Sequence, residues 1–179
     1  MKLILALLAV LLLAPIGLRA QTPAPAQSPD YFTLTGNFSS FSNQSSTTPA
    51  VIATAALNLT TRVSVGYEHI QVSSVSARWE LGVASYTLPL NSLLGKKISS
   101  KLVFDPSNIN VTFSAGAGKL LQPTANRIAE TAGFHISYPL MDHVSVKLVG
   151  VDFLHVGVQS GFLTTNVTEA VSTGLNISF

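Results

Sequence analysis

Hydrophobic and polar residues alternate through residues 166–179, the last segment of the chain. The odd-numbered positions are predominantly apolar, and the even-numbered positions are small or polar. Because side chains of a β-strand point alternately to opposite faces, this pattern predicts one strand with an apolar face and a small polar face. The chain ends on the apolar face with Phe179.

The same alternation recurs upstream, with polar or turn-forming residues between the repeats. The seven further segments are residues 31–38, 51–60, 62–68, 78–84, 109–118, 127–138 and 144–156. Repeated strands of this length are typical of membrane barrels, and an even strand number lets both termini lie on one side. The pattern predicts an all-β fold, an eight-stranded antiparallel up-and-down transmembrane β-barrel.

Two connections are short, residues 60–62 and 139–143, and we expect these to face the periplasm. The outer loops are then residues 39–49, 71–76, 118–126 and 157–165. Residues 89–108 are too long for a periplasmic turn. They predict either a short amphipathic helix at the rim, around Leu93 and Leu94, or a further strand over 98–104 that would change the strand count. We favour the helix.

The alternation fails in residues 149–156. A β-bulge near Gly150 restores it, because one extra residue shifts the side chains that follow to the other face. The bulge would place Asp152 on the same face as Lys147.

The alternation alone does not show which face of the strands contacts water. A soluble protein with its apolar face inside, a secreted sandwich or a lipocalin-like barrel, is therefore the alternative. Composition favours the membrane, since 47% of residues are hydrophobic and only 10% are charged. Aromatic residues also lie near segment ends, as the interfaces of a bilayer require: Phe32, Tyr67, Trp79, Tyr138 and Phe179.

Residues 1–20 have the order of a secretory signal peptide, with cleavage after Ala20 or, alternatively, after Ala26. A proline-rich linker, residues 21–30, precedes the barrel, residues 31–179. Cleavage after Ala20 leaves eight basic and eight acidic residues, so the remaining chain has no formal net charge. Nucleic-acid binding would need a clustered basic face, which the sequence does not indicate. The chain has no cysteine, which excludes disulfides and thiolate metal sites. We expect no cofactor and a location in the bacterial outer membrane.

The terminal GLNISF and the segment YPLMDHVSVKLVGVDF, within residues 133–153, resemble the small OmpA/OmpX-type outer-membrane barrel proteins. The resemblance implies insertion by the barrel assembly machinery, for which a terminal aromatic, here Phe179, is the usual recognition element. Larger members of that family carry a peptidoglycan-binding domain after the barrel. We expect no cell-wall tethering of this chain.

A barrel of eight strands encloses a lumen that side chains can fill. Parity and the predicted bulge assign an interior polar network with a structural role: Arg62, Glu68, Arg78, Glu80, Arg127, His135, Lys147 and Asp152. Strand pairing would bring Glu68 near Glu80, and we expect Arg78, alone or with Arg127, to bridge the two carboxylates.

The expected function is a non-enzymatic monomeric barrel in outer-membrane lipid, with a structural, envelope-integrity or surface-interaction role. Any partner would bind the outer loops. His135 and Ser137 resemble the active-site residues of lipid A deacylase barrels, so a lipid-modifying enzyme that also uses Glu130 is one alternative. A narrow channel is another. The four histidines show no ligand spacing, so the sequence predicts no metal site.

Overall fold

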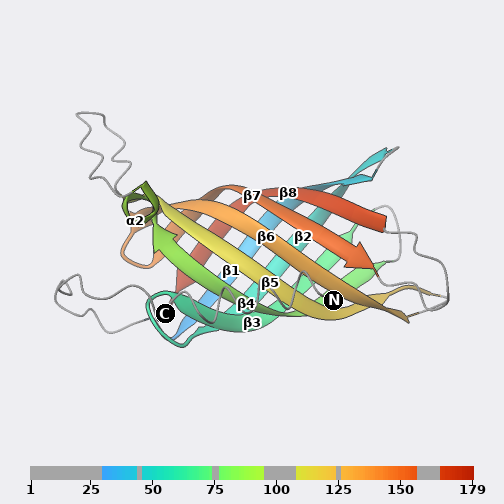
Figure 1. Ribbon diagram of the computed structural model, residues 1–179, viewed down its shortest axis with the longest axis horizontal. Coiled ribbons are helices and arrows are strands. Elements are labelled where there is room, and N and C mark those ends of the chain that lie inside the picture. Colours follow the sequence, from blue (N-terminus) through green and yellow to red (C-terminus); the bar gives the residue numbers. More distant parts are fainter. Residues whose placement is uncertain (1–29, 44–45, 74–76, 95–107, 124–125, 157–165) are drawn as a thin grey trace.

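Eight β-strands form a closed antiparallel barrel in the computed structural model, which describes residues 30–43, 46–73, 77–94, 108–123, 126–156 and 166–179 (Figure 1). The strands are β1 (Phe32–Asn43), β2 (Ser46–Asn58), β3 (Val63–Val72), β4 (Arg78–Pro89), β5 (Asn110–Leu121), β6 (Asn126–Met141), β7 (Val144–Val156) and β8 (Asn166–Ser178). The predicted fold class and strand number are confirmed.

Each strand pairs with its neighbour in sequence, and β8 pairs with β1 to close the barrel. Backbone hydrogen bonds extend this closure to the last residue. The Phe179 N–H donates to the Phe32 carbonyl oxygen at 2.8 Å, and the Phe32 N–H donates to the Phe179 carbonyl at 3.3 Å. No backbone edge is left open along this seam, which a strand in lipid requires.

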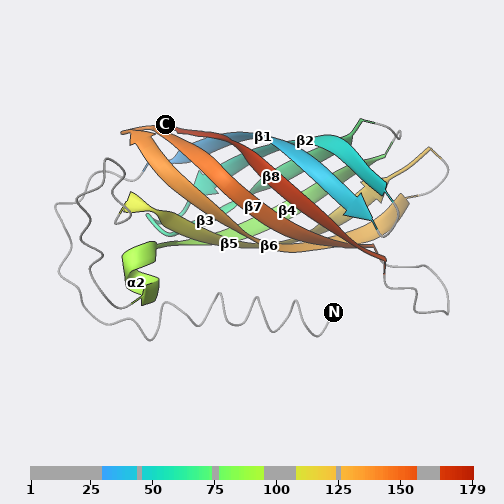
Figure 2. The same ribbon diagram turned by 90° about the horizontal axis from the view of Figure 1, so that it is seen from above.

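The barrel has two distinct ends (Figures 1 and 2). The C-terminus, the helix α2 (Leu90–Leu94) and the connections 59–62 and 142–143 lie at one end, called here the turn end. The last residues of β1, β3, β5 and β7 and the first residues of β2, β4, β6 and β8 lie at the other, the loop end.

The loop between β1 and β2 is much shorter than predicted. The ladder continues from Ser39 opposite Ala50 to Asn43 opposite Ser46, so most of residues 39–49 are strand and not loop. The sequence prediction failed because strand pairs that extend past a bilayer need no apolar face, and their Ser and Thr residues then look like a loop. For the same reason β5 and β6 extend into the predicted loop 118–126.

α2 (Leu90–Leu94) confirms that a short helix follows β4. The alternative strand over 98–104 lies outside the described residues, as do the predicted signal peptide and most of the linker. No helix in the described part of the chain is long and apolar enough to cross a membrane.

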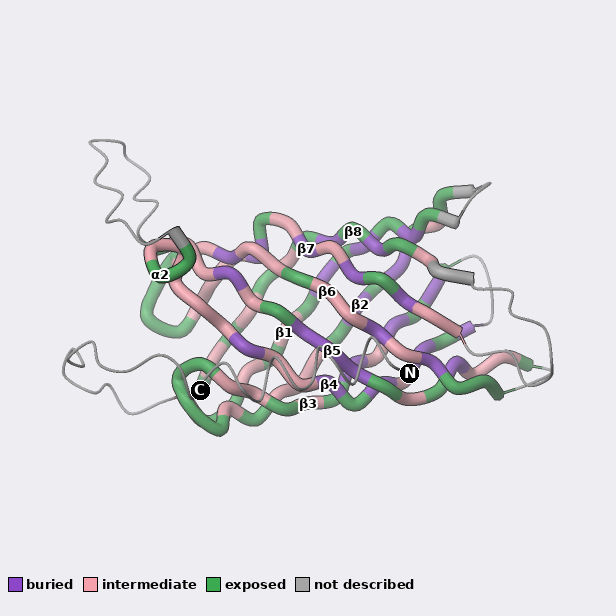
Figure 3. The backbone as a smooth tube through the Cα atoms, viewed as in Figure 1, coloured by how far each residue is buried: buried purple, intermediate pink, exposed green. Residues whose placement is uncertain are grey.

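Exposed and buried residues alternate along the strands (Figure 3). Large apolar side chains are exposed on the outer wall; among them are Leu34, Phe38, Val51, Leu57, Val65, Phe134, Phe153, Val171, Leu175 and Ile177. Such a continuous apolar surface suits lipid and not water. In seven strands the outward face is the one that the sequence predicted.

β4 is the exception, because its faces are reversed. Trp79, Leu81 and Val83 were assigned outward but are buried in the interior, whereas Arg78 and Glu80 point outward. The register shows the reason: Leu81 lies opposite the buried Glu68, and Glu80 lies opposite the outward His69. Residues opposite each other in a ladder share a face. The prediction that Trp79 is an interface aromatic is therefore wrong.

The bulge predicted near Gly150 is confirmed. Against β8, the register of β7 shifts between Lys147 and Gly150. Against β6, it shifts between Lys147, which pairs with Ser137, and Val149, which pairs with Ile136. Asp152 and Lys147 consequently share the interior face, where both are buried.

Candidate functional site in the barrel interior

An apolar cluster fills the interior at the loop end. Its buried members, here called the interior apolar cluster, are Phe41, Ala50, Ile52, Ile70, Val72, Ala77, Trp79, Leu81, Val83, Leu120, Ala129, Leu154 and Ala170. The Phe41 and Trp79 rings stack with centroids 5.5 Å apart. We expected a polar interior throughout, and that prediction is wrong for this half. The signal that could have revealed it is the apolar residue on the polar face of several segments, such as Ile52 and Leu154.

The half toward the turn end is polar and partly hollow. A cavity of about 250 Å³ is lined by Ser, Thr and Asn side chains together with Glu68, His135 and Lys147. A second pocket of about 450 Å³ at the turn end shares Asn58, Ser64, Thr87 and Ser178 with it. The interior is therefore a cavity entered from the turn end and closed toward the loop end by the interior apolar cluster.

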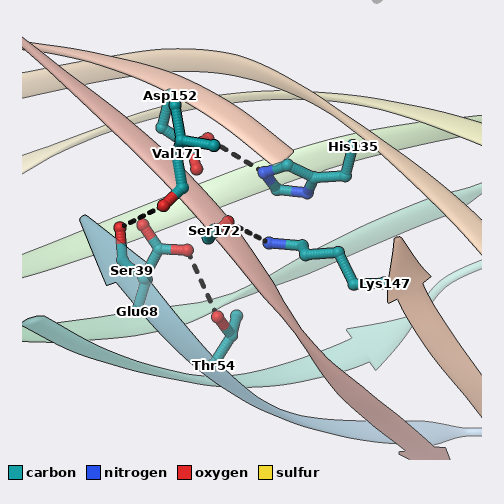
Figure 4. A network of polar contacts seen from close by, with 8 residues as sticks. All are labelled: Ser39, Thr54, Glu68, His135, Lys147, Asp152, Val171 and Ser172. Carbon is teal, nitrogen blue, oxygen red and sulfur yellow. Dashed lines mark hydrogen bonds and ion pairs between the residues drawn. The ribbon is translucent and has the colours of Figure 1, made fainter. Parts of the chain in front are cut away.

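Four ionisable residues lie between these halves (Figure 4). His135 Nε2 lies 2.9 Å from Asp152 Oδ1. Lys147 Nζ donates to Ser172 Oγ at 3.2 Å, and Thr54 Oγ1 donates to Glu68 Oε2 at 3.2 Å. We call Glu68, His135, Lys147 and Asp152, with Thr54 and Ser172, the interior polar cluster.

Two glycines give this cluster its space. A Cβ on Gly133 would collide with the Asp152 carboxylate. A Cβ on Gly150 would lie 2.7 Å from Ser172 Oγ and 3.1 Å from Lys147 Nζ. Gly150 is also the first residue after the bulge that pairs with β8, so it leaves room for its polar neighbours directly beside the register shift.

The structure places only half of the predicted polar network in the interior. Glu68, Lys147 and Asp152 are buried, and His135 is largely so. Arg62 and Arg127 are exposed at opposite ends of the barrel, where β3 begins and β6 begins. Long cationic side chains at strand ends reach water more cheaply than they fill a narrow lumen.

Arg78 and Glu80 lie on the outer wall, so the predicted bridge from Arg78 to Glu68 and Glu80 does not form. Glu80 instead has partners of its own outside the barrel. Arg78 Nε lies 3.3 Å from its carboxylate, His69 Nδ1 lies 3.9 Å away, and the Tyr67 hydroxyl donates to it. Glu68 therefore lies in the lumen without that second carboxylate.

The residues considered for catalysis do not form one site. His135 and Ser137 face the cavity, whereas Glu130 faces outward and pairs with His155 Nδ1 at 3.5 Å. The described residues include no group of three His, Asp or Glu side chains that could hold a metal ion. The described interior residues pair Lys147 with Ser172 and Glu68 with Thr54, but they do not bring His135, Ser137 and Glu130 together.

No family model matches the chain, and no curated protein matches it. Solved structures do. A de novo designed transmembrane β-barrel is 12% identical, with a TM-score of 0.52 over 86% of this chain and 98% of the design. The N-terminal β-barrel domain of Pseudomonas aeruginosa OprF is 8% identical, with a TM-score of 0.50 over 86% of this chain and all (100%) of the domain. Neisserial surface protein A is 11% identical, with a TM-score of 0.48 over 83% and 96%.

At these identities the similarity defines the fold alone. The closed barrel and the apolar outer wall make the chain a transmembrane β-barrel protein whose fold resembles those of bacterial outer-membrane barrels.

Proposed function

We propose that this protein is a non-enzymatic, non-conducting barrel of the bacterial outer membrane, with a structural, envelope-integrity or surface-interaction role. The observation that carries the proposal is the combination of an apolar outer wall with a lumen closed by the interior apolar cluster. The outer wall commits the barrel to lipid, and the closed lumen leaves no continuous polar path for a solute.

Two further partners belong to this proposal. The barrel assembly machinery would recognise the terminal strand through Phe179, whose side chain is 62% exposed at the turn end. The turn end would then face the periplasm, and the loop end would face outward. The extended β1–β2 hairpin and the other loop-end connections are where a surface partner would bind. We expect the protein to be a monomer.

Membrane fractionation combined with heat-modifiable gel migration tests the location and the fold together. We expect the protein in the outer-membrane fraction, migrating faster unheated than boiled because the closed barrel resists detergent. Recovery as a soluble periplasmic protein with no such shift would contradict the proposal.

Planar-bilayer recording tests the closed lumen. Purified wild-type protein should add no discrete conductance steps. Reproducible steps in the wild type would instead favour the channel alternative, and the Leu81→Ala variant provides a reference in which the interior apolar cluster is weakened.

A further inference from the structure

Cationic side chains at the loop end are confined to one part of the wall. Among the described residues, the cations in this half of the barrel are Arg78 on β4, Lys119 on β5 and Arg127 on β6, three adjacent strands. Arg78 and Lys119 point outward, whereas Arg127 lies on the strand face that points inward, opposite Leu120. Two cations thus project from neighbouring strands toward the lipid side.

These two cations are close enough to bind one ligand. Arg78 lies opposite Leu121, two residues beyond Lys119. With strands about 4.8 Å apart and a rise of about 3.4 Å per residue, the Cα atoms of Arg78 and Lys119 are roughly 8 Å apart. Both side chains are longer than half that separation, so their charged groups can meet around a single anion.

Neither cation is fully neutralised by the protein. Glu80 contacts Arg78 through Nε, which leaves the other N–H donors of the guanidinium for a second anion. The Glu80 carboxylate is already engaged by Tyr67, His69 and Arg78. Lys119, which is exposed, lies directly opposite Glu80 in the ladder but forms no ion pair with it or with any other residue in the described part of the chain.

The height of this pair on the wall is that of a lipid headgroup. The next outward residues toward the turn end are Gly82 and Ala84 on β4 and Ala117 on β5, so Arg78, Glu80 and Lys119 border the apolar wall. The eight steps from Glu80 to Leu88 rise roughly 27 Å along the strand. At a tilt of about 40° that is about 21 Å along the barrel axis, close to an apolar band of about 25 Å.

A groove begins at Arg78 and extends away from Lys119, which does not line it. It has a volume of about 660 Å³ and is lined by Gln71, Arg78, Leu121, Gln122, Pro123 and Asn126. Three of these residues carry amide side chains, which donate to and accept from sugar hydroxyls, and Arg78 lies on its wall. A phosphate beside a sugar matches this combination of cations and amides.

We propose that Arg78, Lys119 and this groove form a binding site for the phosphorylated headgroup of a glycolipid in the outer leaflet. The site rests on the proposed function, because it requires the barrel to span the membrane with its loop end outward. The phosphate would bind the guanidinium and the ammonium, and the sugar would lie in the groove among the amides.

The test measures binding of lipid A to the full-length protein in phosphatidylcholine nanodiscs. The double variant Arg78→Gln/Lys119→Gln should bind diphosphorylated lipid A about tenfold or more weakly than the wild type, since two charge-assisted contacts are lost. Dephosphorylated lipid A should bind the wild type weakly, and added salt should weaken only the phosphorylated form. Arg127→Gln is the control: it removes one charge, where the double variant loses two, from the adjacent strand β6 and on the opposite face, and it should bind like the wild type.

Equal affinity of the double variant and the wild type would overturn the site. An equal loss in Arg127→Gln would also overturn it, because the attraction would then come from overall charge and not from this groove. Displacement of the lipid by inorganic phosphate alone at similar concentrations would overturn the assignment to a headgroup. Heat-modifiable migration of each variant is measured in parallel: its absence in the wild type would contradict the proposed function, whereas its presence with unchanged binding would contradict only the lipid site.

Discussion

Gly133 on β6 lies directly opposite Asp152 on β7, and the missing side chain of the glycine leaves the space that the Asp152 carboxylate occupies. From that position Asp152 reaches His135 Nε2 at 2.9 Å. A buried polar contact inside a narrow barrel thus depends on a neighbour with no side chain. Polar groups in such a lumen are stable only when they fit and are paired.

Gly133→Ala should therefore lower the free energy of unfolding by about 1–3 kcal/mol, because the new methyl group displaces Asp152 from His135. Urea unfolding in detergent micelles or lipid vesicles measures the change. Gly82→Ala is the control, since a Cβ there would meet only the Ala117 carbonyl oxygen at 3.8 Å. The free energy of unfolding should be clearly lower for Gly133→Ala than for Gly82→Ala. Equal values would show that Asp152 does not depend on the space at Gly133.

Asp152→Ala should cost far more stability than the same change at Glu130. Asp152 is buried near Lys147, so its loss leaves a buried ammonium without this carboxylate, at a cost of about 2–4 kcal/mol. Glu130 lies 3.5 Å from His155 on the outer wall near the loop end, where the effect of a charge in an outer-membrane barrel is roughly 0–1 kcal/mol.

The measurement is again equilibrium unfolding, with both variants compared at neutral pH. Restoring the Asp152→Ala variant with a second change, Lys147→Met, should recover part of the loss, because the unpaired charge is removed while the side-chain volume is kept. Failure of the second change to recover any stability would argue that Asp152 acts through His135 alone.

Leu81→Ala and Leu57→Ala test the reversed faces of β4. Both remove the same atoms, but Leu81 is fully buried in the lumen and Leu57 is 49% exposed on the outer wall. Leu81→Ala should cost about 2–5 kcal/mol, because it loses transfer energy and leaves a cavity. The loss of stability in Leu57→Ala should be at or below the low end of that range, because lipid acyl chains fill the space that the leucine side chain leaves. A larger loss for Leu57→Ala would support the sequence-based orientation of β4 instead.

The sequence predicts the strands far better than it predicts the interior. Alternation identified β8 and the bulge near Gly150, because both follow from the period of two along a single strand. It failed at β4, where Leu81 faces inward and Glu80 outward. Near the loop end the outer wall leaves the apolar band, so it accepts charge while the lumen accepts apolar residues. In β4 the apolar residues therefore face the lumen and the charged residues face outward. Only the pairing of β4 with β3 shows this orientation.

For the same reason the interior polar cluster could be predicted only in part. His135, Lys147 and Asp152 were placed inside by parity within their own strands. The pairing of carboxylates with Arg78 required the relative orientation of two strands, which no local pattern contains.

Phe179→Ala should slow assembly in cells without unfolding the finished barrel. Phe179 is held in the structure by its backbone, through two hydrogen bonds to Phe32, and these do not need the ring. The side chain itself is 62% exposed, so its loss removes little packing from the folded state. If the ring serves recognition by the assembly machinery, pulse-chase labelling should show delayed heat-modifiable migration in cells, whereas refolding of the purified variant into detergent should proceed as in the wild type. Equal delays in cells and in detergent would mean that the ring acts in folding itself, and no delay in either would remove Phe179 as a recognition element.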